Sequence, residues 1–180
     1  MHPAFVTGGM RVPSVIRTEE PRDVDQIRVV NERAFGRPDE AALVDALRGP
    51  SGTISLVAES GDRIVGHILF SVVRIDGAAT TLVTSGLAPM AVLPECQRQG
   101  IGSQLVRAGI DACRSAGHDA VVVVGHPDFY PRFGFVPADT KGLRYEHEVP
   151  REAFMVLELR PAALADTRGV VRYRPEFAGH

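Results

Sequence analysis

The residues best suited to chemistry form a short glycine-containing segment in the middle of the chain, residues 97–102, Gln-Arg-Gln-Gly-Ile-Gly. This segment follows a β-rich run that ends near Val92 and precedes a stretch with helical periodicity, so it should join a strand to the start of a helix. The first amide groups of a helix have no intrahelical partners and carry the positive end of its dipole, and glycine lets a ligand approach the backbone closely. The segment therefore predicts a phosphate site, most simply for the phosphate of a cofactor.

Two other kinds of phosphate loop do not fit this segment. A Walker loop needs Gly-Lys followed by Ser or Thr, and no lysine occurs here. A dinucleotide loop would need a third glycine where Leu105 stands, and an acidic residue after the next strand, where Gly125 and His126 stand. The sequence therefore argues against a nucleoside triphosphatase and against a dinucleotide-dependent enzyme.

Three segments together resemble the GNAT acetyltransferases. Residues 97–102 match that family's Gln/Arg-x-x-Gly-x-Gly/Ala signature, and residues 90–94, Met-Ala-Val-Leu-Pro, look like its bulged fourth strand. Residues 129–135, Phe-Tyr-Pro-Arg-Phe-Gly-Phe, resemble its Phe-Tyr-x-x-x-Gly-Phe segment and follow a valine-rich strand in the expected order. The resemblance covers roughly residues 15–159 and looks closest to a small bacterial subgroup whose substrates are largely unassigned.

What this resemblance implies for the cofactor is acetyl-CoA as acyl donor, bound without a metal. The amide groups of residues 98–103 would hold the pyrophosphate of coenzyme A, with Arg98 adding a charge, and the strand backbone near Val92 would hydrogen-bond the pantetheine arm. The implied cofactor-binding residues are Met90, Ala91, Val92, Gln97, Arg98, Gln99, Gly100, Ile101, Gly102 and Ser103.

The implied reaction is N-acetyl transfer, in which a primary amine attacks the thioester directly in a ternary complex. Tyr130 would be the general acid that protonates the departing thiolate. The general base is not fixed by the resemblance, and His126 and Asp128, which leave the predicted strand at residues 120–124, are the candidates. His67 is a further option, although a lone histidine midway along a strand is more often a core residue.

Two alternatives to acetyl transfer stay open from the sequence. The same fold could serve as a sensor module that binds acyl-CoA without turnover, which would follow if a general base is truly absent. The donor could also carry a longer acyl group, such as propionyl or succinyl.

The elements around these residues predict an α+β fold. The expected helices span residues 24–35, 38–47 and 100–116, with a short one near Asp128, and the expected strands span residues 15–17, 53–60, 63–75, 80–92, 120–124, 142–149 and 153–159. Pro89 predicts a bulge or a splayed edge, because proline donates no ladder hydrogen bond. Strand, helix and strand in the order 80–92, 100–116 and 120–124 predict a parallel pair with a right-handed crossover.

The resemblance implies α/β/α layers around a mixed, mostly antiparallel sheet of six to seven strands, with strands 80–92 and 120–124 splayed apart.

The length of 180 residues fits one globular domain. We expect this domain to span residues 13–160, because residues 1–12 carry glycine and proline without periodicity and suggest a flexible leader. The tail at residues 161–180 contains aromatic residues, and we expect it to pack on the domain or on a partner subunit.

Composition and charge limit the possible binding partners of the protein and its cellular compartment. The formal net charge of −2 provides no basic field for a nucleic acid backbone. Apolar runs fall far short of the roughly 20 residues that a membrane span needs. Two cysteines, Cys96 and Cys113, without metal spacing favour reduced thiols. We therefore expect a cytoplasmic monomer or homodimer whose acceptor is a small-molecule or peptide amine.

Overall fold

The computed structural model describes residues 13–49, 51–78 and 82–178, so the predicted leader at residues 1–12 lies outside the described residues. The α-helices are α1 (Val24–Phe35), α2 (Asp39–Leu47) and α3 (Ile101–Ser115). The strands are β1 (Val15–Thr18), β2 (Ile54–Ser60), β3 (Arg63–Asp76), β4 (Thr84–Val92), β5 (Ala120–Val124), β6 (Val136–Pro137), β7 (Leu143–Tyr145), β8 (Phe154–Glu158) and β9 (Gly169–Arg172). Within these described ranges, no helix is both long enough and apolar enough to cross a membrane.

The strands form one mixed sheet whose main path runs β1-β2-β3-β4-β5-β8-β6, and β9 pairs with both β3 and β7 beside this path. The pairs β4/β5 and β7/β9 are parallel, and the other pairs are antiparallel. The predicted α+β fold with a mixed, mostly antiparallel sheet and a β4-α3-β5 crossover is confirmed.

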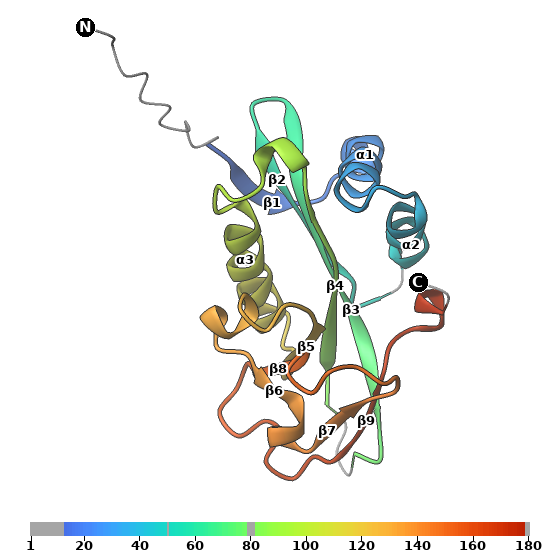
Figure 1. The fold of residues 1–180 in the computed structure, drawn as a ribbon, viewed down its shortest axis with the longest axis vertical. Coiled ribbons are helices and arrows are strands. Elements are labelled where there is room, and N and C mark those ends of the chain that lie inside the picture. The colour runs from blue at the N-terminus through green and yellow to red at the C-terminus, as the bar shows by residue number, and fades with distance from the viewer. Residues whose placement is uncertain (1–12, 50, 79–81, 179–180) are drawn as a thin grey trace, which may run out of the picture.

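Helices cover the two faces of the sheet, as Figure 1 shows, with α3 on one side and α1 and α2 on the other. Two neighbouring residues of β3 mark the two faces, because successive side chains of a strand point in opposite directions. A Cβ atom at Gly66 would lie 3.0 Å from a methyl group of Leu105 on α3, whereas the His67 ring contacts Asn31 on α1. The layers are therefore α/β/α.

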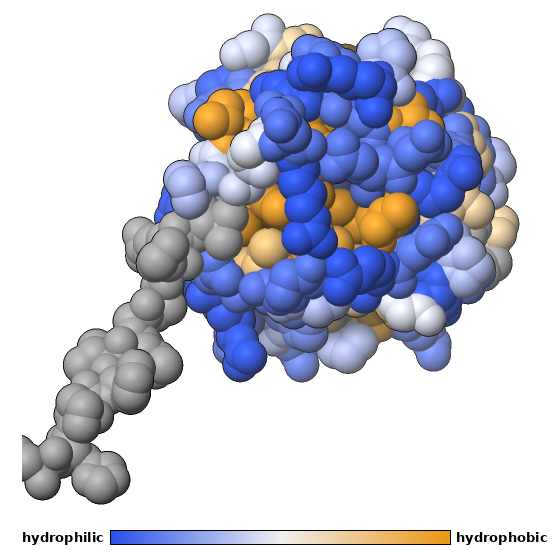
Figure 2. Space-filling view, turned by 90° about the horizontal axis from the view of Figure 1, so that it is seen from above, coloured by the Kyte–Doolittle hydropathy of each residue, from blue (hydrophilic) through white to orange (hydrophobic). Residues whose placement is uncertain are grey.

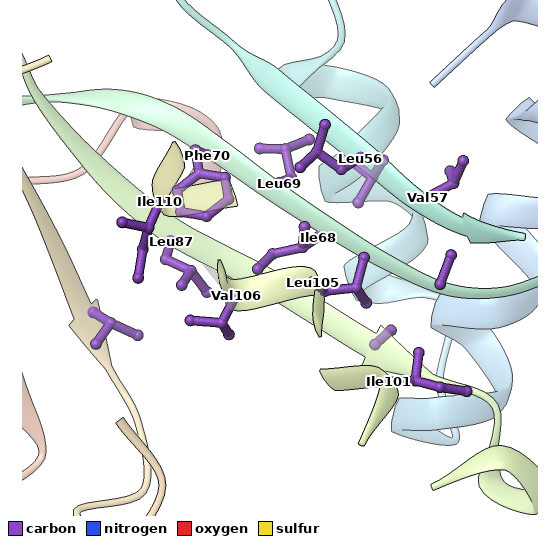
Figure 3. Packing of buried hydrophobic residues seen from close by; sticks show 14 of the residues in the cluster. Leu56, Val57, Ile68, Leu69, Phe70, Leu87, Ile101, Leu105, Val106 and Ile110 are labelled. Carbon is purple, nitrogen blue, oxygen red and sulfur yellow. The ribbon is translucent and has the colours of Figure 1, made fainter. Parts of the chain in front are cut away.

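The main core lies between α3 and the central strands. Residues of α3 at helical spacing point toward β3 and β4 and meet Ile68, Phe70 and Leu87 (Figure 3). The α3 residues in this layer are Ile101, Leu105, Val106 and Ile110, which are almost completely buried. Burying an apolar stripe of this kind is the main driving force for docking a helix on a sheet. This packing fixes the start of α3 relative to the end of β4.

The predicted bulge in β4 is present where Pro89 stands. Leu87 pairs with Phe70 and Met90 pairs with Ile68, so two residues of β4, Ala88 and Pro89, lie opposite one residue of β3. The Ala88–Pro89 peptide bond is cis. A bulge bends its strand and increases the local twist, and it turns the second half of β4 away from the course of its first half.

The second half of the chain differs from the sequence prediction at several points. The helix expected near Asp128 is a single 3-10 turn, η3 (Tyr130–Phe133), and the strand expected over 142–149 ends at Tyr145. The strands β6 and β9 were not predicted. The strand β6 has only two residues, and β9 depends on its pairing with β3 and β7. The 3-10 turns η1 (Pro21–Asp23), η2 (Pro94–Cys96), η4 (Ala138–Lys141) and η5 (Pro175–Phe177) complete the fold.

Candidate active site

The parallel strands β4 and β5 separate over the C-terminal half of β4. They pair only where Thr84–Gly86 lies beside Ala120–Val122, although β4 continues to Val92 and β5 continues to Val124. The bulge at Pro89 therefore opens a gap between them, at the carboxyl ends of two parallel strands. Ligands of open α/β sheets bind at such a position.

The backbone of β4 presents hydrogen-bonding groups to this gap. The Leu93 amide donates to the Val65 carbonyl of β3 at 2.9 Å. Because the backbone groups of successive strand residues point alternately to the two sides, Ala91 also turns its groups toward β3, whereas Met90 and Val92 turn theirs toward the gap. The Gln97 side chain donates to the Val92 carbonyl at 3.0 Å. Of the three predicted strand residues, Met90 and Val92 are therefore the two whose amides can hold a ligand in the gap.

The start of α3 provides a row of amide groups without backbone partners. The N-cap is Gly100, whose φ of 89° lies in the left-handed region that favours glycine. The first amide to bond within this helix is that of Gln104, which donates to the Gly100 carbonyl at 3.0 Å. Among the described residues, the amides of Ile101, Gly102 and Ser103 have no hydrogen-bond partner. Their arrangement fits the phosphate site that the sequence predicted.

Three of the predicted segments meet at Gly102. A Cβ atom at this position would lie 3.7 Å from Met90 Cε of β4 and 3.8 Å from Phe129 Cζ, just before η3. The fold therefore brings the strand backbone, the helix start and the aromatic segment into contact. Viewed from this end of the molecule, apolar side chains are exposed between hydrophilic ones (Figure 2).

Tyr130 lies on the β5 side of the gap and is 7% exposed. Its ring contacts those of Phe129 and Phe135, with centroid distances of 5.0 Å and 5.6 Å. It packs over Gly125, directly after β5, so closely that a Cβ atom there would overlap the ring. Burial raises the pKa of the Tyr130 phenol to about 12. The phenol therefore keeps its proton at neutral pH, as a general acid requires.

The two predicted base candidates lie in the loop that leads to Tyr130. Both His126 and Asp128 are exposed, and the His126 carbonyl accepts hydrogen bonds from the amides of Phe129 and Tyr130 at 3.1 Å and 3.4 Å. Neither side chain makes a hydrogen bond or an ion pair among the described residues. His126 therefore supports Tyr130 through its backbone, and its role as a base, like that of Asp128, stays a prediction. The described residues contain no group of three His, Cys, Asp or Glu side chains that could hold a metal ion.

The third candidate for the base, His67, is completely buried in a hydrogen-bond network. Its Nδ1 lies 3.3 Å from Asn31 Nδ2, and its Nε2 lies 2.9 Å from Ser55 Oγ, whose hydroxyl in turn binds Glu19. The Asn31 amide can only donate, so Nδ1 accepts and the proton lies on Nε2. Burial, with a smaller contribution from Arg48, lowers the pKa of the His67 imidazole to about 3. His67 is therefore a neutral structural residue.

His67 should make the protein sensitive to mild acid. Its imidazole binds a proton below its ordinary pKa of 6.5 when unfolded, but only near pH 3 when folded. The unfolded state thus binds more protons between these values, and stability falls as the pH decreases through this window. We expect the free energy of unfolding to decrease by about 2 kcal/mol from pH 6.5 to pH 5 because of this one group.

Denaturant unfolding of His67→Gln at pH 5 to 7 measures this contribution, because glutamine keeps a donor and an acceptor but does not titrate. We expect the pH dependence of stability to be weaker in His67→Gln by about one proton. An identical pH dependence in His67→Gln and the parent protein would contradict this account.

The structure adds to the site a tyrosine of the aromatic tail, to which the sequence assigned no role in the site. Tyr173, directly after β9, packs its ring on Gly86, and its hydroxyl lies 3.5 Å from the Val122 carbonyl. Gly86 and Val122 are the last residues at which β4 and β5 pair. Tyr173 therefore lies at the base of the gap, on the face opposite α3. No motif marks it in the sequence, since its position depends on the pairing of β9 with β3.

The chain is similar in sequence to known acetyltransferases. Residues 51–137 match a family model described as an acetyltransferase (GNAT) domain. The uncharacterized N-acetyltransferase YjhQ of Escherichia coli K12 is 40% identical over 134 residues, which cover 72% of this chain and 74% of that protein. The uncharacterized N-acetyltransferase YhbS of the same strain is 36% identical over 165 residues, which cover 91% of this chain and 98% of that protein.

Solved structures agree with the sequence matches. The GNAT family N-acetyltransferase YhbS from Escherichia coli, solved in complex with CoA, superposes with a TM-score of 0.86 at 34% identity and covers 99% of this chain and 95% of its own. A GNAT family acetyltransferase from Brucella melitensis, solved in complex with acetyl-CoA, gives a TM-score of 0.75 at 36% identity and covers 92% of this chain and 99% of its own.

Proposed function

Because this chain belongs to the GNAT family of acetyltransferases, we propose that it transfers the acetyl group of acetyl-CoA to a primary amine by direct attack in a ternary complex. The observation that carries this proposal is the gap between β4 and β5. Backbone groups of Met90 and Val92 line one side, the protonated phenol of Tyr130 lies on the other, and the amide groups of α3 stand at its end.

The cofactor is held by this chain's backbone more than by its side chains. The amides of residues 101–103 hold the pyrophosphate, which the dipole of α3 also favours. The amides of Met90 and Val92 bind the pantetheine arm and polarise the thioester carbonyl. The two solved structures cited above, whose proteins bind CoA and acetyl-CoA, support this assignment.

In the transfer step a neutral amine attacks the thioester carbon. A carbon–nitrogen bond forms, the carbon–sulfur bond breaks, and the thiolate takes the proton of the Tyr130 phenol. The proton that the amine loses goes to a base, for which His126 and Asp128 remain the proposed residues, directly or through water. Tyr130 then regains its proton from solvent. Alignment of amine and thioester within the gap supplies much of the rate acceleration.

The acceptor reaches the gap from the face opposite α3. Tyr173 touches the base of the gap, and beside it lies a hollow of about 540 Å³ whose lining includes Tyr145, His147, Tyr173 and Phe177. The Tyr173 ring contacts those of Tyr145 and Phe177 at centroid distances of 5.6 Å and 5.0 Å. We propose this aromatic hollow as the acceptor pocket, because aromatic faces attract both apolar groups and ammonium ions.

The test is calorimetric titration of the purified protein with acetyl-CoA, followed by a thiol-release assay against amines. The panel contains polyamines, aromatic amines, amino acids and peptides with a free N-terminus or lysine, and the donors compared are acetyl-CoA, propionyl-CoA and succinyl-CoA. We expect micromolar binding of acetyl-CoA and thiol release that depends on one class of amine.

Each result separates the open alternatives. Binding without release for any donor would favour an acyl-CoA sensor over an enzyme. Faster release from propionyl-CoA or succinyl-CoA would keep the enzyme but change the donor. Absence of acetyl-CoA binding would overturn the proposal.

A further inference from the structure

The ring of Tyr173 lies across both strands at the closed end of the gap, where β4 and β5 begin to separate. A Cβ atom at Gly86 would lie 2.4 Å from Cε1 and 2.7 Å from Cζ of this ring, so its phenol end rests on the β4 backbone. On the β5 side, the Tyr173 hydroxyl lies 3.5 Å from the Val122 carbonyl. Gly86 and Val122 are the last residues at which the two strands pair. The ring therefore forms a wall at the closed end of the gap.

Several contacts hold Tyr173 in this position. Its backbone amide donates to Glu146 Oε1 at 2.9 Å, and Glu146 Oε2 accepts a hydrogen bond from Arg172 at 3.2 Å. Its ring packs edge-on against the rings of Tyr145 and Phe177. The strand β9, which ends directly before it, pairs with β3 and with β7. Because a closely packed ring can move only if its neighbours move too, this wall is rigid.

The closed end of the gap lies near the proposed general acid. Burial raises the pKa of the Tyr173 phenol, and the phenols of Tyr145 and Tyr130 add to this increase. The contribution of Tyr130 means that its phenol lies within electrostatic range of Tyr173, although Tyr130 reaches the gap over Gly125, on the β5 side. Since Tyr173 stays protonated at neutral pH, it offers an uncharged aromatic surface to a group bound beside it.

The donor and the gap have their parts in the same order. In acetyl-CoA the acyl group is at the opposite end of the molecule from the pyrophosphate, with the pantetheine arm between them. The free amides at the start of α3 lie at the open end of the gap, where Gly102 faces Met90, and the strands join at Gly86. A donor whose pyrophosphate binds these amides therefore directs its acyl group toward the closed end.

We infer that the Tyr173 ring limits the length of the acyl chain that the donor can carry, so that acetyl is preferred over longer chains. This inference rests on the proposed function, which places the thioester between the β4 backbone and Tyr130. Each methylene added to the acyl group extends it toward a wall that does not yield. A closely fitting pocket discriminates against one extra methylene by about ten- to two-hundredfold.

The experiment measures the Kd of coenzyme A, acetyl-CoA, butyryl-CoA and hexanoyl-CoA by calorimetry. No amine is added, so effects on the acceptor do not enter. Two variants, Tyr173→Leu and Tyr173→Met, replace the ring by a smaller or a flexible side chain, and either suffices if the other does not fold. Tyr173→Phe keeps the ring. The Kd of coenzyme A, which has no acyl group, reports whether the rest of the donor site is intact.

The matched control is Phe154→Leu, which removes a buried ring from the same apolar cluster. Phe154 stacks on Tyr145 at a centroid distance of 5.3 Å, and it belongs to β8, whose neighbours in the sheet are β5 and β6. This variant therefore loosens the packing around Tyr173 while leaving the ring of Tyr173 on Gly86. Melting temperatures show whether each variant is folded.

We expect the parent protein to bind acetyl-CoA about tenfold or more tightly than hexanoyl-CoA, with butyryl-CoA between them. In Tyr173→Leu and Tyr173→Met this preference should decrease to about threefold or less, through tighter binding of hexanoyl-CoA, while the Kd of coenzyme A stays within about twofold. Tyr173→Phe and Phe154→Leu should keep the preference of the parent protein.

Four outcomes would contradict the inference. Equal affinity of the parent protein for acetyl-CoA and hexanoyl-CoA would mean that no wall limits the chain, and it would leave the proposed function intact. An unchanged preference in Tyr173→Leu or Tyr173→Met would assign the limit to another residue. An equal loss of preference in Phe154→Leu would assign it to general packing. Absence of acetyl-CoA binding to the parent protein would overturn the proposed function and this inference with it.

Discussion

We expect Tyr130→Phe to reduce kcat by about a hundredfold or more, because it removes the acid that protonates the departing thiolate. The affinity for acetyl-CoA should stay within about twofold, since the ring and its contacts with Phe129 and Phe135 are kept. The measurement is kcat and KM by thiol release from pH 6 to pH 10, with Kd from calorimetry. Because the pKa of Tyr130 is about 12, its phenol stays protonated from pH 6 to pH 10. Titration of this group should therefore not lower kcat in this range.

Stability and affinity serve as the control for Tyr130→Phe. The phenol hydroxyl makes no hydrogen bond among the described residues, so its removal should leave the melting temperature nearly unchanged. If Tyr130→Phe keeps full turnover at every pH, Tyr130 is not the general acid and its place in the motif is structural.

We expect Gly125→Ala to reduce turnover by about ten- to a hundredfold without any change in a catalytic side chain. An alanine Cβ would overlap the Tyr130 ring, so the phenol must move away from the gap. Gly125 does not have a positive φ, and alanine is therefore compatible with its backbone. The loss would come from displacement of Tyr130 alone, because even a displacement of about 1 Å can cost two orders of magnitude.

A double-mutant cycle tests this cause directly. If Gly125→Ala acts through Tyr130, adding it to Tyr130→Phe should cost little further turnover, since the acid is already absent. Thiol-release assays on the two single variants and the double variant give the coupling. Additive losses would mean that Gly125 contributes to the gap independently of Tyr130.

Most central elements were predictable because they are long and periodic. The helix α3 shows its inner face in the spacing of Ile101, Leu105 and Ile110, and β5 is a run of valines buried by its neighbours. The bulge at Pro89 also follows from one residue type. In contrast, β9 has four residues and exists only through its partners β3 and β7, which are far away along the chain.

The site was predictable where one continuous segment forms it. The helix start at residues 100–103 could be located from the sequence, because its amide groups belong to consecutive residues. Which strand residues face the gap depends on the register between β3 and β4. This register turns the amides of Met90 and Val92 toward the gap, whereas Ala91 turns its backbone groups toward β3.

The two faces of the sheet at the gap are covered by different parts of the chain. The segment matched by the family model ends at residue 137, whereas the face opposite α3 is covered by β7 and by residues 169–177. Substitutions in β7 and in residues 169–177 can therefore change the proposed acceptor side of the gap without changing the amides at the start of α3. We expect chains with nearly identical glycine loops to acetylate different amines, so a useful classification of these proteins would compare their final forty residues.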